Sequence, residues 1–320
     1  MTGERSSNGR NNIDLGPGTE FDLVRILLTQ WGKAAQRIGD DAAIIDVPRE
    51  ERLVVSTDTS VEGIHFRRDW LSTFEIGYRA TAASLSDLAA MAARPLGILI
   101  ALTLPKADTD EARELATGIR EGASAVMCPI VGGDLSSGNN LSLTITALGS
   151  AARPLTRSGA KPGQTVYVTG RLGGPASAVR SWRAGKEPRE SDRARFASPV
   201  PRIEPAIGLA ERGATAGIDI SDGLTADLSH VAAASKVGIE IDADRIPRVD
   251  GVTAAQAASS GEEYEIVVTA PKIDTRQFLE EFGLDLTEIG RVVVGTPSVT
   301  LLQEGKPISA PPGFDHFRDK

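Results

Sequence analysis

The alternation of strand-like and helix-like segments is the feature that most constrains how this chain can fold. The runs 96–104 and 141–148 are short and apolar, and the second alternates apolar with hydroxyl residues as a half-buried strand does. Apolar residues that recur at helical spacing predict helices over 21–31, 74–93, 109–125 and 224–235. Strands and helices mixed in this order predict an α/β or α+β protein.

A cluster of proline and glycine divides the chain near residue 155. Residues 151–154 and 158–163 have the composition of turns at a domain junction. A new strand is expected directly afterwards at 165–169. The 320 residues fit two domains of roughly 100–200 residues each. We therefore expect a disordered tail over 1–18, an N-terminal domain over 19–155 and a C-terminal α+β domain over 156–320.

Shorter segments complete the expected organisation. An apolar run predicts a strand over 42–47, and the polar composition of 185–197 indicates a charged loop. Helices are expected over 176–184 and 203–212. Further apolar runs predict strands over 53–56, 129–131, 217–220, 239–241, 263–269 and 288–294.

Charge and composition exclude several classes of function. The net charge is −8, from 35 Lys and Arg against 43 Asp and Glu, so a diffuse nucleic-acid surface is not expected. No stretch approaches the ~20 apolar residues that span a bilayer, and the polar first residues do not form a secretory signal. Cys128 is the only cysteine, which excludes a disulfide framework. We expect a cytoplasmic protein that binds neither membrane nor nucleic acid.

Carboxylates provide the strongest chemical signal. Aspartates gather at the ends of predicted elements, and Asp87 lies within 82–91, a segment of otherwise small or apolar residues. Each aspartate alone could serve a turn or cap a helix. That explanation fits Asp87 poorly, because burying a carboxylate is costly unless a cation or several donors compensate. With one cysteine and three scattered histidines, converging carboxylates favour Mg²⁺ and a polyphosphate substrate.

The common nucleotide-binding motifs are missing. The sequence has no G-x-x-x-x-G-K-[ST] loop, and no G-x-G-x-x-G opens a helix after a strand. The glycines of 170–174 open a predicted helix, and a tight turn explains them better than a phosphate cradle. Gly132 and Gly133 are better candidates, because they let the backbone approach a phosphate while the adjacent Asp134 offers a metal ligand.

Taken together, the motifs resemble those of thiamine-monophosphate kinase. The resemblance runs in order from about Thr19 to Phe317, nearly the whole chain, and the combination is what makes it specific. It rests on the segments Ile38–Ala43, Ser56–Phe66, Ser84–Met91, Gly132–Asp134, Leu155–Gly163, Ile218–Leu224, Gly261–Glu265 and Gly313–Phe317. The sequence departs from the family's usual residues at 135–139, at Ser260 and at Phe314.

The resemblance implies a fold similar to those of aminoimidazole-ribonucleotide synthetase and selenophosphate synthetase. Such proteins have two α/β domains, pair their N-terminal sheets in a homodimer and bind ATP without a P-loop. The resemblance also implies transfer of the γ-phosphoryl group of ATP to thiamine monophosphate, with several Mg²⁺ ions. Because the acceptor is already a phosphate, charge neutralisation and in-line positioning can replace a strong general base.

The family's motifs also imply roles for individual residues, none of them a catalytic acid or base. The implied metal ligands are Asp41, Ser56, Thr57, Asp58, Asp87, Asp134, Asp219 and Asp222. The implied ATP contacts are Gly133, Asp134, Arg157 and Ser221. The implied substrate contacts are His65, Glu262 and Phe314.

Three alternatives remain open at this point. The chain could be another ATP-dependent synthetase of the same superfamily, although selenophosphate synthetase needs a cysteine or selenocysteine near the N-terminus and Cys128 lies mid-chain. It could be a non-catalytic nucleotide- or thiamine-binding homologue, although no metal ligand has been lost. It could also be a structural oligomer whose acidic clusters are only turns; measuring Mg²⁺ and nucleotide binding would decide this.

Overall fold

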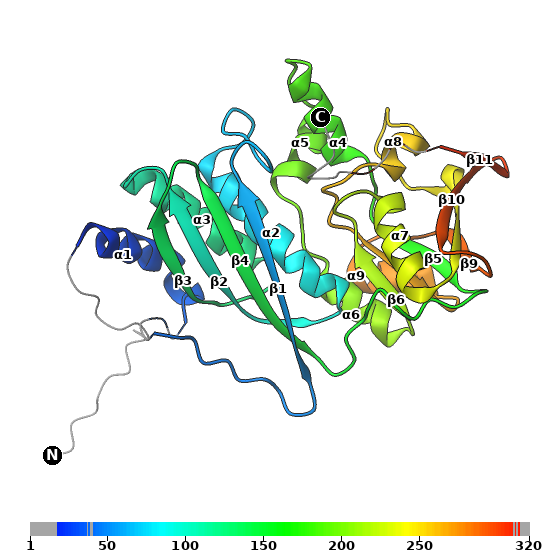
Figure 1. The fold of residues 1–320 in the computed structure, drawn as a ribbon, viewed down its shortest axis with the longest axis horizontal. Coiled ribbons are helices and arrows are strands. Elements are labelled where there is room, and N and C mark those ends of the chain that lie inside the picture. The colour runs from blue at the N-terminus through cyan, green and yellow to red at the C-terminus, as the bar shows by residue number, and fades with distance from the viewer. Residues whose placement is uncertain (1–17, 37, 39–40, 310, 312, 314–320) are drawn as a thin grey trace.

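The computed structural model describes residues 18–36, 38, 41–309, 311 and 313, so the expected tail over 1–18 lies outside the described residues except for Gly18. The described chain forms two units that lie side by side (Figure 1). Residues up to 151 surround a four-stranded sheet, and residues from 165 onwards contribute to a seven-stranded sheet. The expectation of two units that mix helices and sheets is confirmed.

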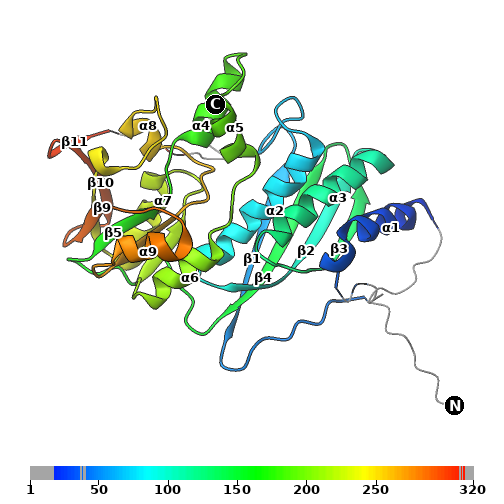
Figure 2. The same ribbon diagram turned by 180° about the vertical axis from the view of Figure 1, so that it is seen from behind.

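The N-terminal unit is a four-stranded sheet with helices on one face (Figure 2). Its strands, in the spatial order β1-β4-β2-β3, are β1 (Arg52–Val61), β2 (Arg94–Leu104), β3 (Ile130–Ser137) and β4 (Ser142–Ala151). Its helices are α1 (Thr19–Trp31), α2 (Thr73–Ala90) and α3 (Thr109–Ser124), with a 3-10 turn over Gly32–Ala34. Only β2 and β3 are parallel, and α3 provides the crossover that a parallel pair requires.

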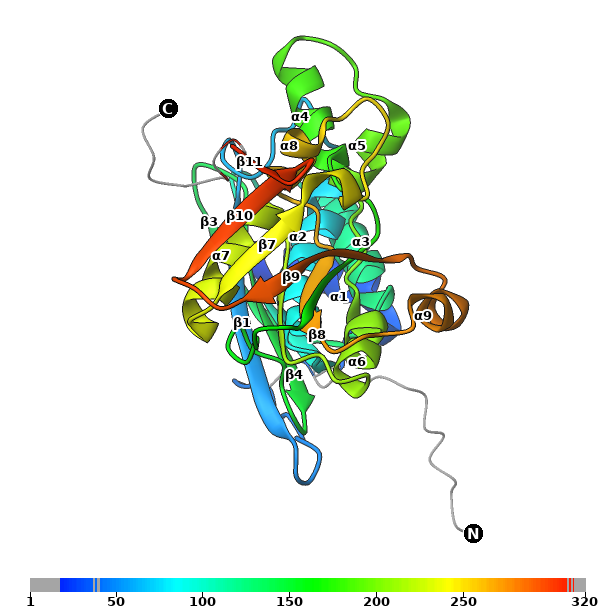
Figure 3. The same ribbon diagram turned by 90° about the vertical axis from the view of Figure 1, so that its right-hand side faces the viewer.

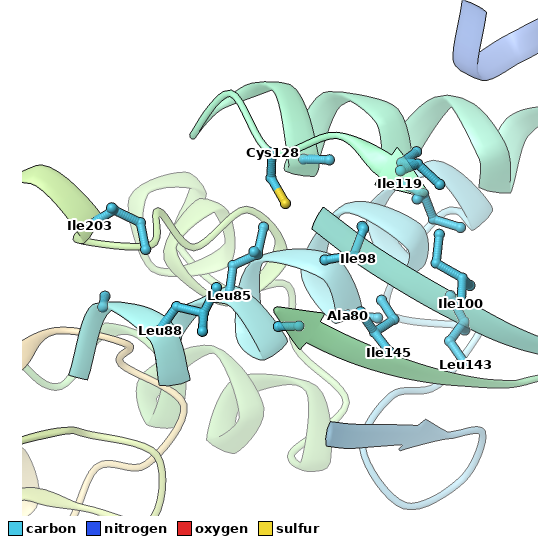
Figure 4. Packing of buried hydrophobic residues seen from close by; sticks show 14 of the residues in the cluster. Ala80, Leu85, Leu88, Ile98, Ile100, Ile119, Cys128, Leu143, Ile145 and Ile203 are labelled. Atoms are coloured by element: carbon cyan, nitrogen blue, oxygen red, sulfur yellow. The ribbon is translucent and has the colours of Figure 1, made fainter. Parts of the chain in front are cut away.

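The sheet and α2 bury the core of this unit between them. Figure 4 shows Leu85 and Leu88 of α2 among side chains of β2 and β4 such as Ile98 and Ile145. Helices α2 and α3 cross closely because glycines lie at the contact. A Cβ atom at Gly118 would stand 1.9 Å from the carbonyl oxygen of Phe74, so no larger residue fits without moving the helices apart.

The opposite face of this sheet has no helix over it among the described elements. Side chains of β1 and β2 point to it, and Leu53 and Val55 are 49% and 54% exposed. In β2, Leu99, Ala101 and Thr103 occupy this face, since the alternate residues Ile98, Ile100 and Leu102 are buried beneath the helices. We call this surface the open face.

The C-terminal unit is built on a largely antiparallel sheet (Figure 3). Its strands are β5 (Thr165–Thr169), β6 (Ala216–Asp219), β7 (Gly238–Asp242), β8 (Ile266–Ala270), β9 (Leu286–Val293), β10 (Ser298–Gln303) and β11 (Lys306–Ile308). The order is β11-β10-β7-β9-β5-β8-β6, and only β10 and β7 are parallel. Its helices are α4 (Gly174–Arg183), α5 (Glu190–Ala197), α6 (Ile203–Glu211), α7 (Leu224–Ser235), α8 (Ala254–Ala258) and α9 (Thr275–Phe282), with a 3-10 turn over Ala243–Arg245.

Helix α2 joins the two units. Besides its own sheet and α3, it contacts α5, α6 and β6 of the C-terminal unit. Its residues are therefore buried on almost every side, including the charged Arg79 and the hydroxyl-bearing Ser84 and Ser86. One continuous hydrophobic cluster extends from Leu88 across the boundary to Ile203 and Phe278.

Two of the predictions about secondary structure were wrong. Residues 42–47 form no strand, because among the described residues no neighbouring strand accepts their hydrogen bonds, and Ile44 is 74% exposed. Part of the expected charged loop 185–197 is helix α5. The many charged residues of α5 obscured its apolar side, on which Phe196 is buried. One of these charges, Arg193, is paired with Glu75 of α2 at 2.5 Å.

The hairpin β10–β11 and the short helices α8 and α9 were not expected from the sequence. Apart from these, the other elements match the expected ones to within a few residues, except that β1 and β3 run on to Val61 and Ser137, well beyond the expected strands 53–56 and 129–131. The helix over 224–235 and the strand over 165–169 match without any shift. None of the helices in the described ranges combines the length and the apolar character that crossing a bilayer requires.

Candidate active site

A cavity of about 490 Å³ lies between the two units, and we call it the inter-unit cavity. Strand β1 and helix α2 line it from the N-terminal side, while β6 lines it from the C-terminal side. Residues 156–158, which connect the units, close a third side. Four residues expected from the sequence lie here together: Ser56, Asp87, Arg157 and Asp219.

Two serine hydroxyls hold the two carboxylates of this cavity. Ser56 donates to Asp87, and Ser86 donates to Asp219 across the boundary at 2.7 Å. Asp219 is only 6% exposed. Because each serine comes from β1 or α2, the N-terminal unit fixes the orientation of a carboxylate that the C-terminal unit supplies.

Both carboxylates are held where burial and the charge of neighbouring carboxylates disfavour their ionised forms. Burial is the main cause that raises the pKa of Asp87, with a further contribution from Asp58, while Ser56 and Arg157 oppose it. Burial and then the charge of Asp87 raise the pKa of Asp219 to about 7. Burial disfavours the charged form and a neighbouring like charge adds to the effect. A bound cation would relieve both causes.

The loop between β6 and α7 is held by a residue that the sequence analysis missed. One oxygen of Asp227, Oδ2, accepts hydrogen bonds from the backbone N–H groups of Ser221, Asp222 and Gly223 at 3.0 to 3.1 Å. Burial, with the charges of Asp219 and Asp222, raises the pKa of Asp227 to about 7. The available signal was a carboxylate within the largely apolar first turns of 224–235.

Glu262 lies on a second loop that packs against this one. Its backbone N–H donates to the carbonyl of Ser221 at 2.7 Å, and its carboxylate binds Arg79 of α2. Glu262 and Tyr264 both have positive φ, 61° and 52°, which non-glycine residues seldom adopt unless the surroundings enforce it. Glu263 helps to enforce it, since its buried Oε1 accepts from the N–H of Gly173 at 2.5 Å.

A second group of expected residues lies elsewhere, in a pocket of about 540 Å³ on the open face. Asp41, Gly133 and Asp134 line this pocket. Thr57 belongs to the same face, because its hydroxyl meets that of Thr146, which also lines the pocket, at 3.2 Å. Asp58 is the neighbour of Thr57 in β1 and therefore points to the opposite face. Strand alternation thus divides the expected ligands between two places.

His65, Ser221 and Asp222 are not among the residues that line the inter-unit cavity. Nδ1 of the half-buried His65 accepts a hydrogen bond from the backbone N–H of Val61 at 3.1 Å, just after β1. Ser221 and Asp222 belong to the loop that Asp227 holds. Phe314 lies outside the described residues.

Mg²⁺ fits the chemistry of the inter-unit cavity. Within the described part of the chain, no three carboxylate, imidazole or thiol side chains are gathered as a complete cage. A complete cage is not needed, because Mg²⁺ is usually held by one or two carboxylates together with waters and substrate phosphates. Asp87 and Asp219, with their raised pKa values, are a pair that a divalent cation would stabilise.

Comparison with known proteins agrees with this geometry. Residues 39–151 match the N-terminal domain of AIR synthase related protein, and residues 161–301 match its C-terminal domain. The chain therefore belongs to the AIR synthase related family, whose two domains correspond to the two units on either side of the cavity.

Curated relatives show to which group within this family the chain belongs. The chain is 34% identical to the thiamine-monophosphate kinase of Salmonella typhimurium, over 88% of this chain and 91% of that protein. It is 34% identical to the thiamine-monophosphate kinase of Haemophilus influenzae, over 94% and 98%. Within the AIR synthase related proteins, the chain belongs to the thiamine-monophosphate kinase family.

Solved structures support the same assignment. The crystal structure of thiamine-monophosphate kinase from Stenotrophomonas maltophilia K279a has a TM-score of 0.79 and 34% identity, covering 92% of this chain and 98% of that one. AaThiL complexed with AMPPCP and TMP has a TM-score of 0.75 and 30% identity, covering 93% and 97%.

The raised pKa of Asp219 predicts how the stability of the metal-free protein depends on pH. Folded Asp219 keeps its proton to about pH 7, whereas its ordinary pKa is 3.8. The folded state therefore binds more protons than the unfolded state between these values, and stability falls as pH rises through the interval. Each pKa unit corresponds to about 1.4 kcal/mol.

We expect Asp219→Asn to remove this contribution. In EDTA, its thermal midpoint should exceed that of the unmodified protein at pH 8 and approach it near pH 4 to 5. Asp110→Asn is the control, since the side chain of Asp110 is 89% exposed. An Asp219→Asn variant that is no more stable than the unmodified protein at pH 8 would contradict the assignment of a buried, repelled carboxylate.

Proposed function

We propose that this chain transfers the γ-phosphoryl group of ATP to thiamine monophosphate, giving thiamine diphosphate and ADP. The observation that carries the proposal is the pair Asp87 and Asp219, which the two units hold together beside Arg157 in one cavity. The relatives that support it are named for this activity, and AaThiL has been solved with AMPPCP and TMP. These relatives favour a kinase over the other synthetases of the superfamily.

The problem that the residues have to solve is electrostatic. Both reactants are polyanions, and a phosphate acceptor needs no strong base to activate it. Arg157 can grip phosphate oxygens through its guanidinium fork. Asp87 and Asp219 are the residues that would hold Mg²⁺, with Asp58 beside them. When bound, Mg²⁺ supplies charge neutralisation and alignment of the two phosphates.

The chain prepares this arrangement before substrates arrive. Ser56 and Ser86 fix the carboxylates, and Asp227 fixes the loop that carries Ser221 and Asp222. Fixed dipoles and charges stabilise a developing charge without reorganising during the reaction. We propose that Glu262, with His65 and Phe314, contacts the thiamine part of the acceptor. The expected cytoplasmic location stays a prediction.

The first prediction of this proposal concerns the acceptor. We expect ADP and thiamine diphosphate when the protein is incubated with ATP, Mg²⁺ and thiamine monophosphate, and no phosphorylation of free thiamine. The reason is that arginine and a carboxylate-bound metal position an acceptor through its phosphate oxygens, which free thiamine lacks. Product analysis by chromatography decides this. Equal turnover of free thiamine would overturn the proposal.

The second prediction is that nucleotide binding depends on the metal. ATP with Mg²⁺ should raise the thermal midpoint clearly, by an amount equivalent to about 2.7 kcal/mol at a ligand concentration 100 times Kd. ATP alone should raise it little, because the carboxylates of the cavity repel its phosphates. Asp87→Asn should keep the fold but lower both the shift and the turnover, the latter by about 100-fold or more.

The control for this variant is again Asp110→Asn, which should behave like the unmodified protein. Equal thermal shifts with ATP alone and with ATP plus Mg²⁺ would contradict a bridge of carboxylate, metal and phosphate. Normal turnover of Asp87→Asn at saturating Mg²⁺ would place Asp87 outside the site.

We propose that the protein is a homodimer that pairs the open faces of two N-terminal sheets. A single chain leaves Leu53, Val55 and Ala101 of this face exposed, and Ile44 next to it is 74% exposed. Exposed apolar side chains gathered on one face of a sheet are typical of an interface. Pairing would also place the pocket with Asp41 and Asp134 beside the partner subunit.

Light scattering should therefore give the mass of two chains at micromolar concentration. Ala101→Glu should shift the protein towards one chain, because it places a charge in the middle of the paired face beside Asp134, to whose position Ala101 is paired in the sheet. Leu279→Glu is the control, since Leu279 is an exposed apolar residue of α9 in the other unit. A single-chain mass for the unmodified protein would contradict this proposal.

A further inference from the structure

Arg79 makes a buried contact between the units that the proposed reaction does not yet use. It lies on α2 and is 5% exposed. Its Nη2 pairs with Oε2 of Glu262 at 2.5 Å, and its Nη1 donates to the carbonyl of Phe196 at 2.5 Å. The guanidinium carbon lies 3.8 Å from the centroid of the Phe196 ring. One nitrogen of the planar guanidinium thus binds α5 and the other binds Glu262.

The carboxylate of Glu262 is held from one side. Besides Arg79, the hydroxyl of Tyr264 donates to the same Oε2 at 2.5 Å. Among the described residues none donates to Oε1, and the side chain of Glu262 is 34% exposed. Since the backbone at Glu262 is also strained, with φ at 61°, several contacts combine to fix one carboxylate oxygen and leave the other for a ligand.

The position of Arg79 on α2 links this contact to the metal residues. Ser86 follows Arg79 by seven residues, which is two turns, so both project from about the same side of the helix. Ser86 holds Asp219, and Arg79 holds Glu262. One rigid helix of the N-terminal unit therefore sets the distance between the residue expected to hold metal and the residue expected to meet thiamine.

We infer that Arg79 is a positioning residue for the acceptor: it holds Glu262 by Oε2, so that Oε1 can accept a hydrogen bond from an N–H donor on the thiamine part of thiamine monophosphate. The inference rests on the proposed function. It assigns Arg79 no contact with either substrate. The effect of Arg79 on the affinity for the acceptor passes through Glu262, and this separates the proposed role from a general structural one.

Arg79→Lys tests the inference, because lysine keeps the charge but lacks the fork that reaches Phe196 and Glu262 together. We expect KM for thiamine monophosphate to rise about tenfold, with KM for ATP and kcat changed less than about twofold. The control is Arg94→Lys, which alters another Arg–Glu pair between the units. Arg94 is the first residue of β2, and its pair with Glu204 of α6 is exposed. This variant should leave all three constants unchanged.

A double-mutant comparison separates positioning from structure. If Arg79 acts through Glu262, Arg79→Lys should raise KM for thiamine monophosphate in the unmodified chain but not in a chain that carries Glu262→Ala. A structural role predicts the same rise in both. Tyr264→Phe removes the other donor to Oε2 of Glu262. It should raise KM for thiamine monophosphate and leave KM for ATP unchanged. This variant replaces Arg79→Lys in the test if Arg79→Lys lowers the thermal midpoint below the assay temperature.

The outcomes are distinguishable. If the unmodified chain makes no thiamine diphosphate, the proposed function fails and the inference fails with it. If the unmodified chain is active but Arg79→Lys or its substitute Tyr264→Phe leaves KM for thiamine monophosphate unchanged, the inference alone is overturned. An equal rise with and without Glu262→Ala overturns it as well.

Discussion

The approach of two carboxylates in the cavity between the units is the interaction on which the rest of the structure depends. Removing Asp87 and Asp219 from water is unfavourable, and their charges repel each other. The serine hydroxyls and Arg157 offset only part of this cost, so the fold has to hold the carboxylates in place. Helix α2 does so because packing on almost every side leaves it no freedom to relax.

Much of the fold could be predicted because local patterns and tertiary structure agree. The alternation in 141–148 and the helical spacing in 224–235 are signals of elements whose one face is buried. The apolar run 42–47 carried a similar signal, yet a strand also needs a neighbour, which no local pattern reveals. The helix within 185–197 escaped prediction for the opposite reason, since its charged residues are paired with distant ones such as Glu75.

The site was predicted in its chemistry and only partly in its geometry. The expectation that Asp87 is partly buried among apolar residues is confirmed, because composition alone indicates it. The separation of Thr57 and Asp134 from Asp58 depends on which face of the sheet the helices cover, and a single sequence does not specify that. Arg79 binds Glu262 on a loop that is distant in sequence, and Asp227 accepts hydrogen bonds from backbone N–H groups. No sequence motif indicates either contact. The domain boundary near residue 155 stays a prediction.

The hydrophobic cluster that extends from Leu88 to Ile203 and Phe278 has a consequence for how the protein is made. Ribosomes release the N-terminal half first, at about 5–20 residues per second. The side of α2 that meets α5 and α6 therefore has no partner until the later segments emerge, on the order of ten seconds after α2 itself. During that interval the nascent chain carries an exposed apolar surface, which is the feature that favours aggregation and that makes chaperones necessary.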